Sequence, residues 1–145
     1  MNLVKISIAI LVAVISSTAF AATLISSKEA ELPDISPTLS TRGISRGPAI
    51  KLNSPETNAP VVSPFEFKVS FDARGDSKID PNSVKVIYLK SPFVDLTPRL
   101  INAISSKGID FSKAEVPPGT HIIRITVKDT EGRETNSVMN LVVAK

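Results

Sequence analysis

His121 is the only histidine among the 145 residues, and the chain has no cysteine. A catalytic triad or a metal site would need partner side chains, yet there is no second imidazole, no thiolate and no G-x-S-x-G nucleophile elbow. His121 follows a Pro-Pro-Gly turn and, by strand parity, shares a face with Ile123 and Ile125. We therefore expect a histidine at the edge of the core that bonds a turn backbone. We expect no enzymatic activity, and a small hydrolase that uses His121 is the alternative.

Acidic side chains gather in the predicted loops. Asp72, Asp76 and Asp80 lie between two predicted strands, and Asp129 lies in the predicted last hairpin. Calcium binds about six to eight oxygen atoms that converge on one point, and the loops of a sandwich can supply them. The spacing here is not the D-x-D-x-D ligand pattern, and aspartates in turns commonly bond their own backbone. We therefore expect no cofactor, and calcium at Asp72, Asp76, Asp80 and Asp129 is the alternative.

Phe93 is the one aromatic residue whose position suggests a loop or an edge. It either tucks back into the core or forms, with Val94 and Asp95, a contact patch for a protein partner. Carbohydrate sites commonly stack sugars on tryptophan and tyrosine, and the chain has no Trp and one Tyr. We expect a protein contact at Phe93, Val94 and Asp95. The loops 72–80 and 91–97 and the edge strands offer further contacts.

The composition describes one modest globular domain. Hydrophobic residues make up 42% of the chain and charged residues 21%, which is too apolar for a disordered chain. The 17 Lys and Arg residues against 14 Asp and Glu residues give a formal net charge of +3. A nucleic-acid partner would need a clustered basic face, so we expect none. Without cysteine the chain forms neither a disulfide nor a bacterial lipoprotein anchor.

Residues 1–21 have the pattern of a signal peptide. A single lysine precedes an apolar run over residues 6–15, and Ala19 and Ala21 give the A-x-A arrangement that signal peptidase reads. The run of about 10 apolar residues is shorter than the ~20 that a transmembrane helix needs. We therefore expect cleavage after Ala21, export to the periplasm or the medium, and no transmembrane segment in the processed chain.

Residues 22–47 contain Ser, Thr, Pro and balanced charge, with little apolar periodicity. The prolines of this segment break any helix that starts in it. We expect a flexible tether over 22–47 and one folded domain over 48–145. In the alternative, Leu24 and Ile25 dock on the domain.

The folded domain shows the alternation of half-buried strands. In the clearest strand, Phe65, Phe67, Val69 and Phe71 alternate with polar residues. Further strands are predicted around 50–52, 84–89, 121–128 and 134–143, with a brief or edge strand at 109–111 and a short irregular segment at 95–107. About seven antiparallel strands bury two apolar faces by packing as two sheets. The predicted fold class is therefore an all-β, antiparallel β-sandwich.

Two stretches resemble bacterial immunoglobulin-like modules. The run Ile79–Val86 is similar to the approach to their third strand, and Gly119-Thr120-His121 with Asp129 and Gly132 is similar to their final hairpin. The resemblance covers residues 48–145 and implies an exported immunoglobulin-like or cadherin-like sandwich of about seven strands without catalytic residues. Such modules serve as spacers, adhesive units or accessory domains. The chain lacks an Asn-x-Ser/Thr sequon, which favours a bacterial source.

These observations predict a non-enzymatic, exported protein that binds another exported or cell-envelope protein. Edge strands and loops of the sandwich would make the contact. In one alternative, residues 22–47 do the recognition and the sandwich only anchors them. In another, the chain is a calcium- or carbohydrate-binding module of the cell envelope.

Overall fold

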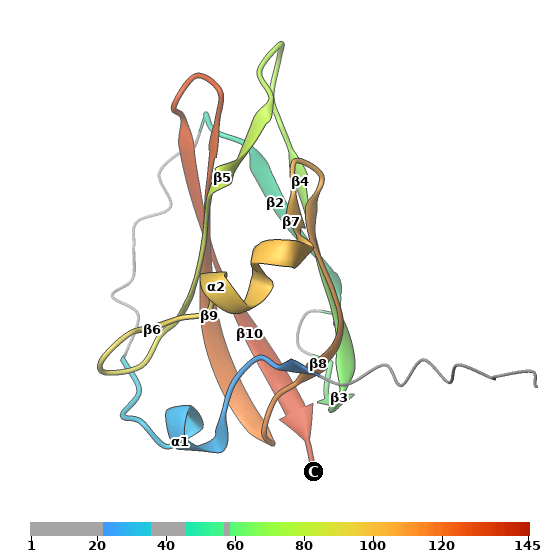
Figure 1. The fold of residues 1–145 in the computed structure, drawn as a ribbon, viewed down its shortest axis with the longest axis vertical. Coiled ribbons are helices and arrows are strands. Elements are labelled where there is room, and N and C mark those ends of the chain that lie inside the picture. Colours follow the sequence, from blue (N-terminus) through green and yellow to red (C-terminus); the bar gives the residue numbers. More distant parts are fainter. Residues whose placement is uncertain (1–21, 36–45, 57–58) are drawn as a thin grey trace, which may run out of the picture.

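The computed structural model describes residues 22–35, 46–56 and 59–145. Within these residues the chain forms ten strands in two five-stranded sheets, together with two short α-helices. The two sheets face each other with the apolar core between them (Figure 1). The predicted all-β sandwich is confirmed.

The first sheet contains the strand that the alternation predicted most clearly. β4 (Phe65–Asp72) buries its three phenylalanines and Val69, and the residues between them face outward. This confirms the predicted facing of the strand. The sheet is completed by β2 (Ala49–Ser54) on one side of β4, by β8 (Gly108–Glu115) on the other, and by β1 (Ala22–Thr23) and β7 (Ile104–Ser105), which pair with β8.

The second sheet contains the longest strands of the described chain. Its order is β3 (Val61–Val62), β10 (Glu134–Ala144), β9 (Gly119–Asp129), β5 (Ile79–Tyr88) and β6 (Val94–Asp95). In β9 every second residue from His121 to Asp129 is buried, so the residues between them face outward. β9 pairs with β10 in an unbroken antiparallel register. The outward side chains of neighbouring strands therefore lie in rows across this sheet.

The segment 95–107, expected to be irregular, contains a short helical stretch between β6 and β7. The stretch consists of α2 (Thr97–Leu100) and the 3-10 helix η1 (Ile101–Ala103). Leu96 and Leu100 are both 0% exposed, so this segment closes one side of the sandwich. Figure 1 shows α2 crossing between the two sheets.

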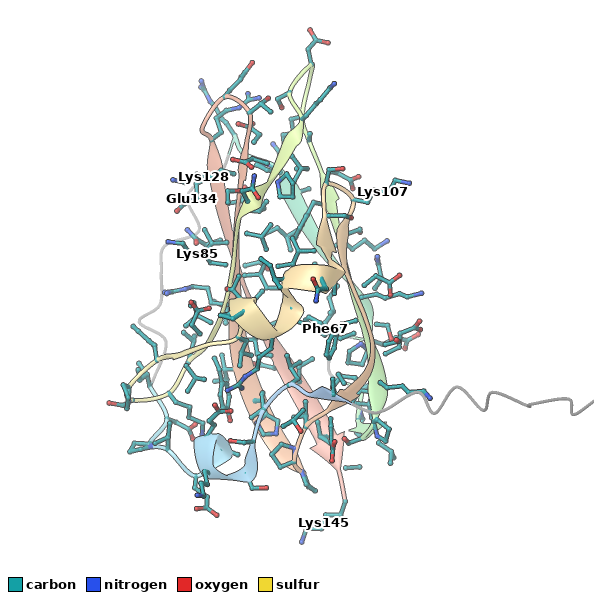
Figure 2. All side chains as sticks on the ribbon, in the orientation of Figure 1. Phe67, Lys85, Lys107, Lys128, Glu134 and Lys145 are labelled. Atoms are coloured by element: carbon teal, nitrogen blue, oxygen red, sulfur yellow. The ribbon has the colours of Figure 1, made fainter. Side chains whose placement is uncertain are left out.

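The centre of the core is filled by large side chains from both sheets. Phe67 on β4 and Tyr88 on β5 are both fully buried. Figure 2 shows Phe67 pointing into the space between the sheets. By volume these are the two largest side chains among the fully buried residues of the described chain.

Several strand predictions are wrong in detail. The strand predicted at 109–111 is neither brief nor at an edge. It is β8, which has eight residues and pairs with β4 on one side and with both β1 and β7 on the other. Its alternation breaks where Ser112 and Lys113 are both exposed and Lys113 has a φ of 54°, which hides the length of the strand from its sequence. The strands are not all antiparallel, since β1 runs parallel to β8 and β3 parallel to β10. The expected number of about seven is lower than the ten observed, because four of the ten are strands of only two residues.

Residues 22–35 pack against the sandwich, so the expected tether is wrong for this stretch. Leu24 and Ile25 are 0% and 1% exposed and belong to the core cluster. This is the docked arrangement that the sequence left as the alternative. α1 (Ser27–Ala30) follows directly. Two buried apolar side chains and the β1–β8 pairing hold the segment, although its composition is that of a linker.

The predicted signal peptide at residues 1–21 and the tether residues 36–45 lie outside the described part of the chain. Among the described residues, no helix has the length and apolar character that a membrane crossing requires.

Candidate functional site

His121 is 2% exposed and belongs to a buried chain of hydrogen bonds. Its Nδ1 lies 2.8 Å from the Tyr88 hydroxyl, and its Nε2 lies 2.7 Å from the carbonyl oxygen of Pro117. Because a carbonyl only accepts, Nε2 carries the proton and the Tyr88 hydroxyl donates to Nδ1. The predicted bond to the turn backbone is confirmed, and both ring nitrogens are occupied by contacts within the fold.

The surroundings of His121 keep the ring neutral. Burial lowers the pKa of His121, and the bond to Pro117 opposes this effect only in part. Burial also raises the pKa of the Tyr88 hydroxyl. At neutral pH the imidazole is therefore uncharged and the Tyr88 hydroxyl keeps its proton, which are the protonation states that the hydrogen bond between them requires.

Lys90 joins the N-terminal segment to this buried group. It is 5% exposed, and its ammonium lies 5.4 Å from the centroid of the Tyr88 ring. The ammonium donates to the carbonyl oxygen of Ala30 at 3.1 Å and to the carboxylate of Asp34. Burial acts to lower the pKa of Lys90, but the Asp34 carboxylate and Tyr88 together outweigh this and hold the pKa above its usual value. A paired, buried lysine of this kind fixes the segment in place.

The four aspartates considered for calcium are not brought together in the structure. Asp129 is 3% exposed, and its carboxylate accepts the backbone N–H groups of Glu131 and Arg133 at 3.0 Å and the Arg133 Nε at 2.7 Å. Burial acts to raise the pKa of Asp129, but these donors hold it below its usual value. Asp80 accepts the N–H of Asn82 within its own turn.

Asp72 is the last residue of β4 and Asp76 lies in the turn between β4 and β5, and both are exposed. No group of three or more His, Cys, Asp or Glu side chains in the described ranges is placed to hold a metal ion. The carboxylates of Asp80 and Asp129 bond backbone groups of their own turns instead.

The predicted contact residues lie at the edge of the second sheet. Phe93 is 55% exposed, so it does not tuck back into the core. Val94 is half-buried in β6, and Asp95 is exposed with its carboxylate accepting the Thr97 N–H at 2.9 Å. The Phe93 ring lies 5.6 Å from the guanidinium carbon of Arg124. Phe93 thus connects the predicted patch with the outer face of the sheet.

Arg124 lies at the centre of this outer face. In the register of the sheet it stands between Ile87 on β5 and Val138 on β10. One row further along, Lys85 on β5 stands next to Thr126 on β9. Directly opposed side chains have Cβ atoms about 5 Å apart, so these residues form a continuous surface.

Three basic side chains of β5 and β9 gather on this surface, and we call Lys85, Arg124 and Lys128 the basic face. They surround a shallow depression with a volume of about 440 Å³. Its lining residues are Ser83, Lys85, Arg124, Thr126, Lys128, Glu134 and Asn136. Figure 2 shows Lys85, Lys128 and Glu134 on the outer side of the sheet, away from Phe67.

Exposed apolar side chains also favour the second sheet. The large hydrophobic residues exposed in the described chain are Val62, Phe93, Ile101 and Val138. Three of the four belong to or adjoin the second sheet, and only Ile101 lies elsewhere, in η1. On the outer face of the first sheet, by contrast, Lys68 forms a 2.9 Å ion pair with Glu66. The two outer faces therefore differ in chemical character.

The sequence singled out Phe93, but it did not place Arg124 beside Phe93 or Lys85 and Val138 around Arg124. The alternation of side chains along a strand does assign Lys85 and Arg124 to the outer side of their own strands. The sheet order places β5 beside β9 and β9 beside β10. The alternation within each strand does not predict this order.

The chain matches no protein-family model, no curated protein and no solved structure.

Proposed function

We propose that this chain is an exported, non-enzymatic, immunoglobulin-like module that binds another exported or cell-envelope protein. The contact surface is the outer face of the second sheet, centred on Arg124 with Phe93 and Val138 beside it. Export is supported by the charged, apolar and A-x-A regions within residues 1–21. The non-enzymatic role is supported by His121, whose two ring nitrogens are both bonded within the fold.

The strand order supports the immunoglobulin-like assignment. Such a sandwich has strands A, B, E and D in one sheet and C, F and G in the other. Here β2, β4, β8 and β7 follow the order A, B, E and D, and β5, β9 and β10 follow the order C, F and G. β6 then extends the second sheet next to β5, as in variable-type domains.

The observation that carries the binding proposal is the asymmetry of the two outer faces. Exposed apolar residues beside a cluster of basic ones mark protein contact surfaces, because such contacts combine buried apolar area with directed polar contacts. The second sheet offers Phe93, Val138 and Arg124, and tyrosine, phenylalanine and arginine residues are the types enriched in interfaces. The first sheet offers the paired charges Glu66 and Lys68.

A photo-cross-linking residue placed on each face tests this proposal in the cells that make the protein. We expect p-benzoylphenylalanine at Val138 to give one dominant covalent adduct with an exported protein. The same residue at Glu66, which is exposed on the outer face of the first sheet, serves as the matched control and should give none. Equal adducts from both positions, or none from Val138, would refute the proposal.

A further inference from the structure

We infer that the partner presents an extended segment with acidic residues at alternate positions, and that their carboxylates bind Lys85 and Arg124. The inference rests on the proposed function and adds the chemistry of the partner. It follows from the charges of the basic face, from the spacing of its two central cations and from the apolar residues around Arg124.

Two of the three cations on the basic face form no ion pair within the described residues, although Asp95 stands opposite Ile87 in the same row as Arg124. Lys128 lies 3.6 Å from the Glu134 carboxylate, and both side chains are nearly half exposed. Lys85 and Arg124 form no ion pair with any carboxylate of the described residues. The depression therefore has an excess of positive charge, which attracts a partner of the opposite sign.

The opposite outer face shows what a balanced surface looks like in the same molecule. There Lys68 is paired with Glu66, and Asp110 stands across from Lys68 in the register of β4 and β8. The excess of positive charge on the second sheet is thus a local feature and does not follow from the net charge of the chain alone.

The spacing of Lys85 and Arg124 selects the shape of the ligand. Lys85 stands opposite Thr126, two residues along β9 from Arg124, so Lys85 and Arg124 are diagonal neighbours. Diagonal pairs of this kind lie about 7–8 Å apart. In an extended chain, residues i and i+2 point to the same side and lie roughly 6.6–6.8 Å apart. Two carboxylates at alternate positions therefore match the two cations.

Arg124 is held in a setting that strengthens such a contact. Its neighbours across the sheet are Ile87 and Val138, and the Phe93 ring lies 5.6 Å from its guanidinium carbon. Apolar neighbours reduce the water around the guanidinium, and its planar donors pair with both oxygens of one carboxylate. These neighbours also provide apolar contact for a peptide, which favours an acidic protein segment over an anionic polysaccharide.

Amide NMR titrations of the processed chain test the inference with two synthetic peptides. The first, Ac-Leu-Ser-Asp-Ser-Asp-Ser-Leu-NH2, carries aspartates at alternate positions. The second, Ac-Leu-Ser-Asp-Asp-Ser-Ser-Leu-NH2, has the same composition and charge, but its adjacent aspartates point to opposite sides. We expect the first peptide to shift the amides of Lys85 and Arg124 and to bind about fivefold more tightly, which is the upper end of the contribution of one exposed ion pair.

Neutral variants locate the contact. Lys85→Gln and Arg124→Gln should each weaken binding of the first peptide about fivefold, whereas Lys68→Gln on the opposite face should leave it unchanged. Urea unfolding midpoints close to that of the unaltered chain show that the variants remain folded. Equal binding of the two peptides, shifts confined to another surface, or tighter binding of a heparin fragment than of the first peptide would overturn the inference.

The photo-cross-linking experiment separates this inference from the proposed function. Suppose that a partner is cross-linked at Val138 and that the adduct yield stays the same when Lys85 and Arg124 are both changed to Gln. This result supports the binding role but refutes an acidic ligand. Absence of an adduct at Val138 refutes the binding role itself. A yield that falls at least about fivefold in the double variant supports both.

Discussion

The hydroxyl of Tyr88 on β5 donates to Nδ1 of His121 on β9 across 2.8 Å, inside the core of the sandwich. The opposite ring nitrogen donates to the carbonyl oxygen of Pro117. The only imidazole of the chain therefore links a neighbouring strand to the turn before its own strand. Because both groups are buried, the loss of either partner leaves a polar atom without a hydrogen bond.

His121 should be neutral with its proton on Nε2, and its pKa should lie below the ordinary value of 6.5. The unfolded chain then binds a proton near pH 6.5 that the folded chain does not bind, so stability should decrease as the pH falls below 6.5. Imidazole nitrogen NMR shifts followed through a pH titration measure both properties. A proton on Nδ1, or a pKa above 6.5, would contradict this assignment.

Phe67→Ala should destabilise the fold by about 3–5 kcal/mol, because it opens a cavity at a side chain that is 0% exposed. Urea denaturation measures this change in the free energy of unfolding. Phe93→Ala removes the same ring from a site that is 55% exposed and should cost no more than about 0.5 kcal/mol. Similar costs at the two positions would mean that β4 faces the other way.

Leu24→Ala should cost about 2–5 kcal/mol, since Leu24 is 0% exposed although it lies in a stretch with the composition of a linker. Ile101→Ala is the comparison, because Ile101 is 60% exposed and its loss should change stability by at most about 0.5 kcal/mol. Thermal unfolding of both variants gives the difference. If Leu24→Ala unfolds at the same temperature as the unaltered protein, residues 22–35 do not pack on the sandwich.

Glu29 should support folding above about pH 4.5 and lose this effect in acid. Its hydrogen bond with Arg99, at 2.8 Å, lowers the pKa of its carboxyl from 4.5 to about 2. The folded chain then binds fewer protons than the unfolded one in this interval, so stability falls as the pH drops from 4.5 towards 2. Unfolding midpoints of the unaltered chain and of Glu29→Gln should differ near neutral pH and converge near pH 2. A constant difference would exclude this linkage.

Gly108→Ala should destabilise the protein by more than about 4 kcal/mol. Gly108 has a φ of +147°, and a Cβ atom built there lies 1.8 Å from the carbonyl oxygen of Val69, on the adjacent strand β4. The backbone of β4 would have to move to admit the methyl group. Gly75→Ala is the control, since Gly75 also has a positive φ but meets nothing within 4 Å, and about 1–2 kcal/mol is expected there. Recovery of the soluble protein and its denaturation midpoint measure both changes.

The sequence determined those features that depend on a single strand. Alternation in β4 is enough to predict that Phe67 is buried and that Lys68 is not, because successive side chains of any strand point to opposite faces. The same rule places His121 on the inner side of β9. The lack of helical periodicity and the number of short strands then require two packed sheets.

The tertiary structure decided which strands are neighbours and which apolar residues find a site in the core. Leu24 and Ile25 look like part of a linker, and only the sandwich offers the place that they fill. Phe93 has the apolar character of a core residue, yet it stays exposed against Arg124. The basic face exists because the sheet order sets β5 beside β9, and a pairing between residues some 40 positions apart is not encoded in the local pattern of either strand.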